Sequence, residues 1–508
     1  MHGSAFDDLI ADTGAQRLSP ATAPVTDITD DSRQVSPGCL FVARGRADDD
    51  RWHAWVHTAC AAGAAAVVAP ARIDLPAGVG LAVVPVVDQP LAAALAARFF
   101  GHPARGLKLV GITGTNGKTT VATITQHLLK AAGLRCGLLG TVAIDDGGAD
   151  GPQPAELTTP GAIELQRVFA RMAANGCVAA VMEVSSHALD QGRVAGLAFD
   201  AAVFTNLTQD HLDYHGTMDA YAAAKAKLFG QLADGGTAVV NAESPHAPAM
   251  AAAVGAPGAT VYQSVSNEVD APGAVQFEAL TLTANESRVR FAGPWGSFAA
   301  SLPLIGPYNL MNALQAVTAA HALAPRGEDA WSRDLAACPA VPGRLEAVTF
   351  PGIGTPGDAP AVLVDYAHTP DALVNVLSTL RPLTTGRLIC LFGCGGDRDR
   401  AKRPKMARAA ADGADVLRLT SDNPRTEDPQ QILDDTAAGV PDDRRAALTI
   451  EIDRAKAIAS AVSQARAGDT VLIAGKGHED YQIIGTEKTH FDDREEAAKA
   501  LGCWSPPR

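Results

Sequence analysis

The sequence predicts an α/β protein of three domains. A chain of 508 residues is too long for a single hydrophobic core. Short apolar runs alternate with helical segments along most of the chain, which is typical of parallel sheets covered by helices. A glycine-rich stretch, GITGTNGKTT, stands between one such run and a helix. We therefore expect a small α/β domain over residues 1–103, a central domain over 104–341 and a C-terminal Rossmann-like, doubly wound domain over 342–508.

The central domain is predicted to be of the P-loop ATPase type, with a mostly parallel sheet. The run LKLVGI enters the glycine-rich loop, the helical stretch TTVATITQHLL leaves it, and the runs CVAAVMEV and FDAAVF end in polar loops. Residues 269–304 alternate apolar and polar side chains between turn residues, which indicates a small antiparallel insertion. In the C-terminal domain, apolar runs alternate with helical segments expected at 370–381, 401–412, 429–438 and 453–466.

Composition argues against several classes of protein. The net charge of −14 and the pI of about 5.4 disfavour binding to nucleic acid or to anionic membranes. The N-terminus lacks the basic segment of a signal peptide, and no apolar stretch is long enough to span a bilayer. The eight cysteines form no CxxC pair, which indicates free thiols in a reducing compartment. We therefore expect a cytoplasmic protein that neither enters a membrane nor binds nucleic acid.

Clusters of charged and polar residues directly follow most of the apolar runs. Ligands of open parallel sheets bind at the carboxyl ends of the strands. Ordinary surface loops also follow strands, but they have less reason to be so rich in Arg, Asp, Glu and His. The clusters lie at 111–120, 183–187, 206–211, 365–368, 393–400, 422–425 and 475–479.

The glycine-rich loop predicts a nucleoside triphosphate site. Gly114 and Gly117 allow backbone amides to turn toward phosphate oxygens. Lys118 can reach the terminal phosphates, and the Thr119 hydroxyl can hold Mg²⁺. The alternative is an ordinary glycine-rich turn, against which the Lys-Thr ending argues. The loop is one residue longer than the usual P-loop pattern.

Two other residues are candidates for metal chemistry near this loop. Glu183 ends a predicted strand, where a carboxylate can bind Mg²⁺, although a surface acid is the commoner case. Lys225 falls on the apolar face of its predicted helix, whereas Lys227 falls on the opposite face. Desolvation favours the neutral amine, which can take up CO₂ to form an anionic carbamate. A lysine that extends to water from the helix edge is the alternative for Lys225.

Arginines and acids in the C-terminal half are candidates for binding an anionic substrate. Arg344 in PGRLE stands at the predicted domain junction, where it could reach a triphosphate or brace a hinge. The stretch DNPR is by itself typical of a plain turn, an interpretation that explains its proline but not its arginine. Further candidates in loops that follow strands are Asp365, His368, Arg398, Arg425 and Glu479.

Together these motifs resemble those of the Mur ligases, the ATP-dependent amide-forming enzymes of peptidoglycan synthesis. The stretches GITGTNGKTT, EVSSH, TNLTQDHLDYHG, GPYNLMNALQA, PGRLE, VDYAHTPDAL, FGCGGDRDR, DNPRTEDP and AGKGHEDYQ occur in that family's order, and the longer loop is that family's own form. The resemblance covers most of the chain from residue 100 onward. The motifs are most similar to the branch that adds 2,6-diaminopimelate to UDP-N-acetylmuramoyl-L-alanyl-D-glutamate.

The resemblance implies ATP and Mg²⁺ as cofactors and assigns residues to them. ATP would be bound by Gly114, Thr115, Asn116, Gly117, Lys118, Thr119, Thr120, Asn309, Arg344 and Asp365. The metal would be held by Thr119, Glu183, His211 and Lys225, the last as the carbamate N6-carboxylysine. The residues implied as catalytic are Lys118, His211 and Lys225.

The resemblance also implies two substrate sites, with the N-terminal domain binding the UDP-sugar. The UDP-sugar-peptide would contact Ser32, Thr158, Thr159, Ser185, Gln191 and Arg193. Diaminopimelate would contact Arg398, Asp422, Asn423, Pro424, Arg425, Gly475 and Glu479. An arginine can pair in bidentate fashion with the second carboxylate of diaminopimelate, which lysine lacks. Because lysine-adding relatives generally lack the last residue of DNPR, Arg425 favours diaminopimelate.

The implied reaction is a phosphoryl transfer followed by amide formation. The γ-phosphoryl of ATP would pass to the D-glutamate side chain, and the amine of diaminopimelate would displace phosphate from the acyl phosphate. The implied setting is cytoplasmic peptidoglycan precursor synthesis, and hence cell shape and division, by a monomer that acts on small molecules. The alternatives are a lysine-adding or D-Ala-D-Ala-adding ligase, a folylpolyglutamate synthetase, and a non-catalytic ATP-binding regulator on a ligase fold. Arg425 and the first 100 residues argue against the other ligases, and the presence of the implied lysines and metal ligands argues against the regulator.

Overall fold

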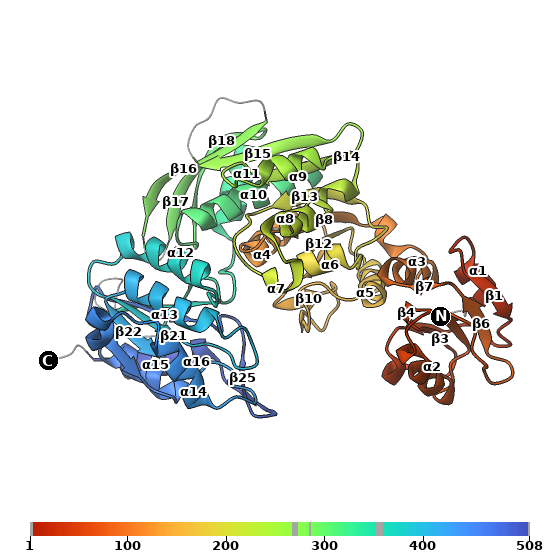
Figure 1. Ribbon diagram of the computed structural model, residues 1–508. Helices are drawn as coiled ribbons and strands as arrows, with labels where there is room; N and C mark the ends of the chain where they lie inside the picture. The colour runs from red at the N-terminus through yellow and green to blue at the C-terminus, as the bar shows by residue number, and fades with distance from the viewer. Residues whose placement is uncertain (1–3, 267–272, 284–285, 351–358, 506–508) are drawn as a thin grey trace. The chain divides into compact units, whose positions relative to one another are not determined.

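The computed structural model describes most of the chain (Figure 1), namely residues 4–266, 273–283, 286–350 and 359–505. The chain divides into two compact units, of which the first is Met1–Ser264 with Gln315–Pro325 and the second is Val265–Leu314 with Arg326–Arg508. Searched over those ranges, no helix is both long and apolar enough to cross a membrane. All eight cysteines are free thiols, as predicted. The predicted domain limits at residues 103 and 341 stay predictions.

The N-terminal part of the first unit is a five-stranded sheet with helices on both faces. Its strands lie in the order β1-β6-β5-β3-β2, and neighbours are parallel except for β1 and β6. Leu40 and Val42 of β3 pack toward α1 and α3, whereas Phe41 between them packs toward α2, as the two-residue period of a strand requires. The elements are α1 (Phe6–Ile10), β1 (Gln16–Ser19), β2 (Asp27–Thr29), η1 (Ser32–Gln34), β3 (Cys39–Val42), β4 (Gly45–Arg46), α2 (Arg51–Ala61), β5 (Ala66–Ala69), β6 (Gly80–Val83), β7 (Val86–Val87) and α3 (Gln89–Phe99).

The central part of the first unit contains the predicted parallel sheet. Six parallel strands lie in the order β9-β12-β8-β13-β14-β15, and the short antiparallel strands β10 and β11 extend the edge at β9. Helix α4 packs against β8, β9 and β12. The strands are β8 (Lys108–Thr113), β9 (Cys136–Leu139), β10 (Ala143–Asp145), β11 (Gln153–Pro154), β12 (Ala179–Glu183), β13 (Phe199–Phe204), β14 (Leu232–Asn241) and β15 (Thr260–Ser266); the helices are η2 (Pro103–Gly106), α4 (Lys118–Ala131), α5 (Ala162–Ala174), α6 (Ser186–Asp190), α7 (Leu212–His215), α8 (Met218–Ala226), η3 (Phe229–Gln231) and α9 (Ala247–Ala252).

The two parts of the first unit are joined by packed helices. Helix α3 contacts α5, and Ala162 and Ile163 of α5 are buried in the core of the N-terminal sheet. The Gln89 side chain accepts a hydrogen bond from the backbone N–H of Ala162 at 3.0 Å. Arg167 donates to the Asp27 carboxylate at 2.8 Å. The N-terminal sheet is thereby fixed to the helix that precedes β12.

The second unit begins with the predicted antiparallel insertion. Strands β16 (Ala274–Leu282), β17 (Ser287–Gly293) and β18 (Gly296–Leu302) pair antiparallel, and α11 (Glu328–Ala336) packs on β18. Residues 269–272 and 284–285 of the predicted insertion lie outside the described residues. Helix α10 (Pro307–Leu323) begins in the second unit and ends in the first.

The rest of the second unit is a doubly wound sheet, as predicted. Its strands lie in the order β19-β20-β24-β21-β22-β23, and only β19 is antiparallel to its neighbour. Helices α12, α13 and α14 cover one face, while α15 and α16 cover the other (Figure 1). The strands are β19 (Glu346–Ala347), β20 (Ala361–Asp365), β21 (Leu388–Phe392), β22 (Val416–Leu419), β23 (Leu448–Ile450), β24 (Thr470–Ala474), β25 (Tyr481–Ile484) and β26 (Glu487–His490); the helices are α12 (Pro370–Leu380), η4 (Arg381–Leu383), α13 (Lys402–Gly413), α14 (Pro429–Ala437), η5 (Asp442–Ala447), α15 (Arg454–Ser463) and α16 (Asp493–Gly502).

Candidate active site

The glycine-rich loop joins β8 to α4 and needs glycine at two positions. Gly114 has a φ of 152°, and a Cβ there would lie 1.8 Å from the Thr205 hydroxyl oxygen, while Gly117 has a φ of 86°. The Lys118 ammonium donates to the carbonyl oxygens of Gly114 at 3.0 Å and Thr115 at 2.9 Å. Lys118 therefore lies over its own loop at the N-terminus of α4, where the helix favours a phosphate.

A second loop, which follows β13, supports the glycine-rich loop. The side-chain oxygen of Asn206 accepts from the backbone N–H of Asn116 at 2.9 Å, and its amide nitrogen donates to the Asn116 carbonyl at 3.2 Å. The Asn206 carbonyl accepts from the N–H of Thr115 at 2.9 Å. Because β13 is the sheet neighbour of β8, the loops after the two strands meet. Sequence analysis did not single out Asn206, although its motif TNLTQDH carried the signal.

Glu183 lies beside the glycine-rich loop, as the sequence predicted. It ends β12, the other neighbour of β8, and its side chain is buried. The carboxylate accepts hydrogen bonds from the Thr119 hydroxyl at 3.1 Å, the Thr141 hydroxyl at 3.0 Å and the Thr141 N–H at 2.8 Å. Thr141 was missed because it reaches Glu183 from the loop after β9, a contact that depends on strand order in the sheet.

Lys225 is buried on the inner face of α8, in agreement with its helical position. Only 1% of the residue is exposed, whereas Lys227 lies at the surface and pairs with Asp190 at 2.8 Å. The Lys225 ammonium donates to the Gly114 carbonyl at 2.8 Å and lies 4.4 Å from the centroid of the Tyr221 ring. Burial, together with the charge of nearby Lys118, holds the pKa of Lys225 well below its usual value. The amine is thus biased toward the neutral form that reacts with CO₂.

Three imidazoles gather next to Lys225. The ring centroid of His187 lies 4.8 Å from that of His211 and 5.5 Å from that of His215, and His215 stacks on Tyr221 with centroids 5.0 Å apart. Burial lowers the pKa of each of these histidines, which favours neutral rings with a nitrogen free to accept or to bind a metal. Sequence analysis selected His211 alone.

The predicted metal ligands suit a hard cation only if Lys225 is modified. In the part of the chain that the structure describes, no three His, Cys, Asp or Glu side chains are placed to hold a metal ion together. The buried carboxylate of Glu183 and the hydroxyl of Thr119 are adjacent oxygen donors of the kind that Mg²⁺ prefers. A carbamate on Lys225 would add two oxygens beside the same loop. With that modification, three of the four predicted ligands supply oxygen and His211 supplies nitrogen, a set that fits Mg²⁺.

Residues predicted to bind the sugar-peptide form a hydrogen-bonded chain that starts at Glu183. The Thr159 hydroxyl donates to the Glu183 carbonyl at 2.9 Å and accepts from the Ser185 N–H at 3.0 Å. The hydroxyls of Thr158 and Thr141 lie 3.0 Å apart, and Thr141 in turn contacts the Glu183 carboxylate. These three predicted residues thus gather around Glu183, Thr159 and Ser185 at its backbone and Thr158 at its carboxylate through Thr141.

Arg193 extends this chain and places a half-buried cation at its end. It donates to the Thr159 carbonyl at 2.9 Å and to the Gln191 side-chain oxygen at 2.7 and 3.0 Å. Burial lowers the pKa of Arg193, and the charge of Arg44 from the N-terminal sheet adds to this effect. Arg44 itself pairs with Asp30 at 2.7 Å. Ser32 lies in η1 of the N-terminal sheet and was the only predicted contact in that part.

In the second unit, Arg344 stands just before β19 and lies close to Asp365 at the end of the antiparallel neighbour β20. The Asp365 carboxylate accepts from the N–H of Leu345 at 2.7 Å and of Ala367 at 2.8 Å. Burial raises the pKa of Asp365, although the charge of Arg344 opposes this shift. The Arg344 guanidinium carbon lies 4.5 Å from the centroid of the Tyr366 ring. The arrangement brings two of the three predicted ATP contacts of this unit together.

Asn309, the third predicted contact, is held by hydrogen bonds at the start of α10. Its amide donates to the Ile305 carbonyl at 2.9 Å and its oxygen accepts from Asn312 at 3.2 Å. The preceding residue, Tyr308, lies near Asp365, since the charge of Asp365 adds to burial in raising the pKa of Tyr308. The start of α10 is therefore close to Asp365 even though the Asn309 side chain is bonded elsewhere.

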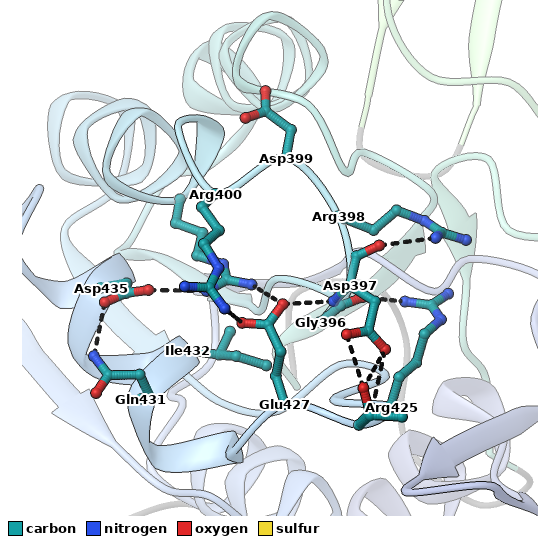
Figure 2. Close-up of polar contacts among 12 residues, drawn as sticks. Gly396, Asp397, Arg398, Asp399, Arg400, Arg425, Glu427, Gln431, Ile432 and Asp435 are labelled. Carbon is teal, nitrogen blue, oxygen red and sulfur yellow. Dashed lines mark hydrogen bonds and ion pairs between the residues drawn. The ribbon is translucent and has the colours of Figure 1, made fainter. Parts of the chain in front are cut away.

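The DNPR stretch lies between two loops of the second unit. Arg425 has a φ of 51°, which is uncommon for a residue other than glycine. Its backbone N–H donates to the Ile483 carbonyl at 3.1 Å, and its own carbonyl accepts from Gly485 at 2.7 Å, so the β25–β26 hairpin holds it on one side. On the other side, its guanidinium donates to the Gly396 carbonyl at 2.9 Å (Figure 2). Arg398 of the same loop is exposed and donates to the Asp397 carbonyl at 3.0 Å.

A buried lysine connects DNPR to GKGHE. The Lys476 ammonium, with no exposed surface, lies 3.3 Å from the Asn423 side-chain oxygen, 3.4 Å from the Glu479 carboxylate and 3.7 Å from that of Asp422. Asn423 also donates to Glu479 at 2.9 Å. Burial and the charge of Asp422 raise the pKa of Glu479. Two carboxylates share one ammonium here, so the cluster favours a second cation such as the ammonium of an amino acid.

Close approaches at two glycines, Gly475 and Gly396, bring the segments of this cluster together. Gly475 has a φ of 119°, and a Cβ there would lie 3.2 Å from the Asp422 carboxylate, so glycine lets the two segments approach. Pro424 is buried, and its carbonyl leaves no space for a Cβ at Gly396. Sequence analysis missed Lys476. The signal was its place in GKGHE directly after a buried strand.

Comparisons with known proteins agree with this architecture. Two family models match the chain, Mur ligase middle domain over residues 112–320 and Mur ligase, glutamate ligase domain over residues 343–477. A Synechococcus elongatus protein named UDP-N-acetylmuramoyl-L-alanyl-D-glutamate–2,6-diaminopimelate ligase is 46% identical over 506 residues, which are 97% of this chain and 98% of that protein. A solved structure of a ligase with the same name is 33% identical, with a TM-score of 0.68 and coverage of 99% of both chains. A Mycobacterium tuberculosis folylpolyglutamate synthase, solved with ADP and AMPPCP, is 20% identical, with a TM-score of 0.60 over 82% of this chain and 96% of its own.

Proposed function

The chain belongs to the Mur ligase family, and on that premise we propose that it adds meso-2,6-diaminopimelate to UDP-N-acetylmuramoyl-L-alanyl-D-glutamate in an ATP-dependent reaction. The observation that carries the choice of amino acid is the cluster in which Asp422 and Glu479 share the Lys476 ammonium, with Arg425 in the same DNPR stretch as Asp422. A guanidinium and an acidic pair are the two groups needed to bind an amino-carboxylate end.

The first step is transfer of the γ-phosphoryl group of ATP to the D-glutamate side chain. The loop amides from Gly114 to Thr119 bind the phosphates, and Lys118 leaves its loop carbonyls to neutralise charge on the phosphate oxygens. Thr119, Glu183, His211 and carbamylated Lys225 would hold Mg²⁺, which would supply further charge neutralisation. The chain from Thr159 to Arg193 orients the glutamyl carboxylate, because it begins at Glu183 beside the loop.

The second step is attack by the amine of diaminopimelate on the acyl phosphate. Arg425 binds the far carboxylate of diaminopimelate and Glu479 its ammonium, while Lys476 holds Glu479 and Asn423 in place. Positioning of this kind can supply several kcal/mol of the barrier. Lysine lacks the far carboxylate, so a bound lysine could not form this contact with Arg425.

The test is phosphate release from ATP in the presence of the UDP-sugar-dipeptide with either diaminopimelate or lysine. We expect release with diaminopimelate and a rate at least tenfold lower with lysine, which corresponds to about 1.4 kcal/mol. Arg425→Ala should reduce this preference. Equal rates with both amino acids would exclude the role of DNPR in selection, and no release with either would favour the non-catalytic regulator.

We further propose that the protein works as a cytoplasmic monomer on small-molecule substrates. Support comes from the character of those substrates, a nucleotide-sugar-peptide and an amino acid. Sedimentation of the purified chain at micromolar concentration should give the mass of one 52.3 kDa copy. A dimer at that concentration would contradict this proposal without affecting the proposed reaction.

A further inference from the structure

We propose that three residues of the second unit, Asp397, Thr426 and Glu427, position Arg425 and thereby set the preference for diaminopimelate over lysine, an inference that rests on the proposed function. We call these three residues the interloop brace. Asp397 comes from the loop after β21, and Glu427 from the loop after β22 (Figure 2); Thr426 directly follows Arg425 in the chain. None of the three belongs to the predicted binding residues.

The interloop brace is reciprocal, because each loop supplies an acid that accepts from the other. The Asp397 carboxylate accepts from the Thr426 hydroxyl at 2.9 Å and from the Thr426 N–H at 3.2 Å. In return the Glu427 carboxylate accepts from the Asp397 N–H at 2.6 Å. Asp397 directly precedes the predicted ligand Arg398, and Thr426 directly follows the predicted ligand Arg425. Any shift of one loop is therefore transmitted to the other.

Arg425 depends on the position of both loops. Its guanidinium donates to the Gly396 carbonyl, one residue before Asp397, while its backbone lies in the loop that carries Thr426. Its φ of 51° is a conformation that persists only when the surroundings impose it. The β25–β26 hairpin holds the backbone of Arg425 from one side, and the interloop brace fixes the loop that its side chain contacts from the other.

Glu427 anchors the interloop brace to a helix. Its carboxylate accepts from Arg403 of α13 at 2.8 Å and pairs with Arg400 at 2.9 Å. Arg403 has no exposed surface and also bonds Asp435 of α14 at 2.8 Å (Figure 2). The two loops are thus tied to packed helices rather than only to each other, which is the arrangement that holds a binding group in a fixed place.

The bonds between Asp397 and Thr426 should affect the preference for diaminopimelate more than the stability of the fold. Asp397 and Thr426 are exposed, so their hydrogen bonds contribute little to the folded state. A small displacement of Arg425, however, weakens a bidentate contact to a carboxylate, which requires both the distance and the plane of the guanidinium. Loss of the bonds between Asp397 and Thr426 should therefore change binding of diaminopimelate more than it changes unfolding.

The test uses substitutions at Asp397 that respect its backbone, together with Thr426→Val. Asp397 has a φ of 54°, which asparagine and glycine both tolerate. Asp397→Gly removes the acceptor oxygens, whereas Asp397→Asn keeps one of them, and Thr426→Val removes the hydroxyl at nearly constant volume. We expect Asp397→Gly and Thr426→Val each to raise the KM for diaminopimelate about tenfold and to reduce the preference over lysine similarly. Asp397→Asn should stay within about threefold of wild type.

Two readouts distinguish positioning from a structural role. The KM values for ATP and for the nucleotide-sugar-peptide should stay within about twofold of wild type. The double variant Asp397→Gly with Thr426→Val should have the same KM for diaminopimelate as Asp397→Gly alone, since Asp397→Gly already removes the acceptor of the Thr426 hydroxyl. An unchanged KM and preference in both single variants would overturn the proposal. Parallel losses for all three substrates with a lowered Tm would also overturn it.

The same assays distinguish a failure of the proposed function from a failure of the role of the interloop brace. A wild-type chain with no phosphate release on addition of diaminopimelate would remove the proposed function and this inference together. If the wild type is active and prefers diaminopimelate, and the variants of the interloop brace have the same KM and preference as wild type, only this inference is excluded.

Discussion

Lys225 and Gly114 are joined by a 2.8 Å hydrogen bond from the lysine ammonium to the loop carbonyl, across 111 positions of the sequence. The bond connects α8 to the glycine-rich loop, while the Tyr221 ring covers the same ammonium and the Tyr221 hydroxyl lies 3.2 Å from that of Thr115. A carbamate nitrogen keeps one N–H, so the bond to Gly114 can persist after CO₂ is added. The Gly114 carbonyl would then orient the new carboxylate.

The first prediction is that Lys225→Arg abolishes most of the activity. Arginine keeps a positive charge but does not form the carbamate, so a proposed metal ligand is lost and phosphate release should fall on the order of a hundredfold. Added bicarbonate should not restore it. The matched control is Lys227→Arg on the exposed face of the same helix, which should remain near wild type. Near-normal activity of Lys225→Ala, insensitive to bicarbonate, would exclude the carbamate.

The second prediction concerns the hydroxyl of Thr119. Thr119→Val removes the donor to Glu183 at nearly constant volume, and we expect the Mg²⁺ concentration for half-maximal phosphate release to rise about tenfold or more. Thr119→Ser keeps the hydroxyl and should behave like wild type. If the valine variant has an unchanged Mg²⁺ dependence, Thr119 does not hold the metal.

Much of the fold could be predicted because the apolar runs are continuous. Strands of a parallel sheet are buried on both faces, so runs such as RLICLF and DTVLIA are recognisable without neighbours. The helix expected at 370–381 is Pro370–Leu380, and the one expected at 429–438 is Pro429–Ala437. The sequence analysis did not predict β11, β19 or the β25–β26 hairpin. These strands are only two to four residues long, and β26 is exposed throughout, so no long apolar run marks them.

The candidate site was predictable where a residue's role depends on its own helix or loop. Lys225 could be placed by helical period alone, and its burial confirms that placement. The contacts of Thr141, Tyr221 and Lys476 could not be predicted, since each reaches a residue of a different element. Their contacts follow from the order of strands in the sheets, which no local pattern contains.

The third prediction is a pH-dependent contribution of Glu427 to stability. The hydrogen bond from Arg403 lowers the pKa of Glu427 to about 2, below the value of about 4.3 for an unfolded chain. Ionised Glu427 therefore stabilises the folded state above pH about 4.3, and this contribution disappears as the pH falls toward 2. The Tm of wild type should exceed that of Glu427→Gln at pH 6, and the difference should shrink steadily below pH 4. A difference that is constant from pH 6 to pH 2.5 would contradict this origin.

The fourth prediction concerns the buried ion pair of Arg454 and Asp493. Both side chains have no exposed surface and form two hydrogen bonds of 2.6 and 2.7 Å, and Arg454 also donates to the carbonyls of Ser421 and Ala474. Asp493→Ala leaves a buried guanidinium without its counter-ion, so the free energy of unfolding from urea titration should fall by about 3–5 kcal/mol. Because Ser421 and Ala474 directly precede residues of the amino-acid cluster, the KM for diaminopimelate should rise as well. Lys456→Ala on the exposed side of α15 should change the free energy of unfolding by less than about 0.5 kcal/mol. A loss below about 1 kcal/mol for Asp493→Ala would show that Arg454 is satisfied by the backbone carbonyls alone.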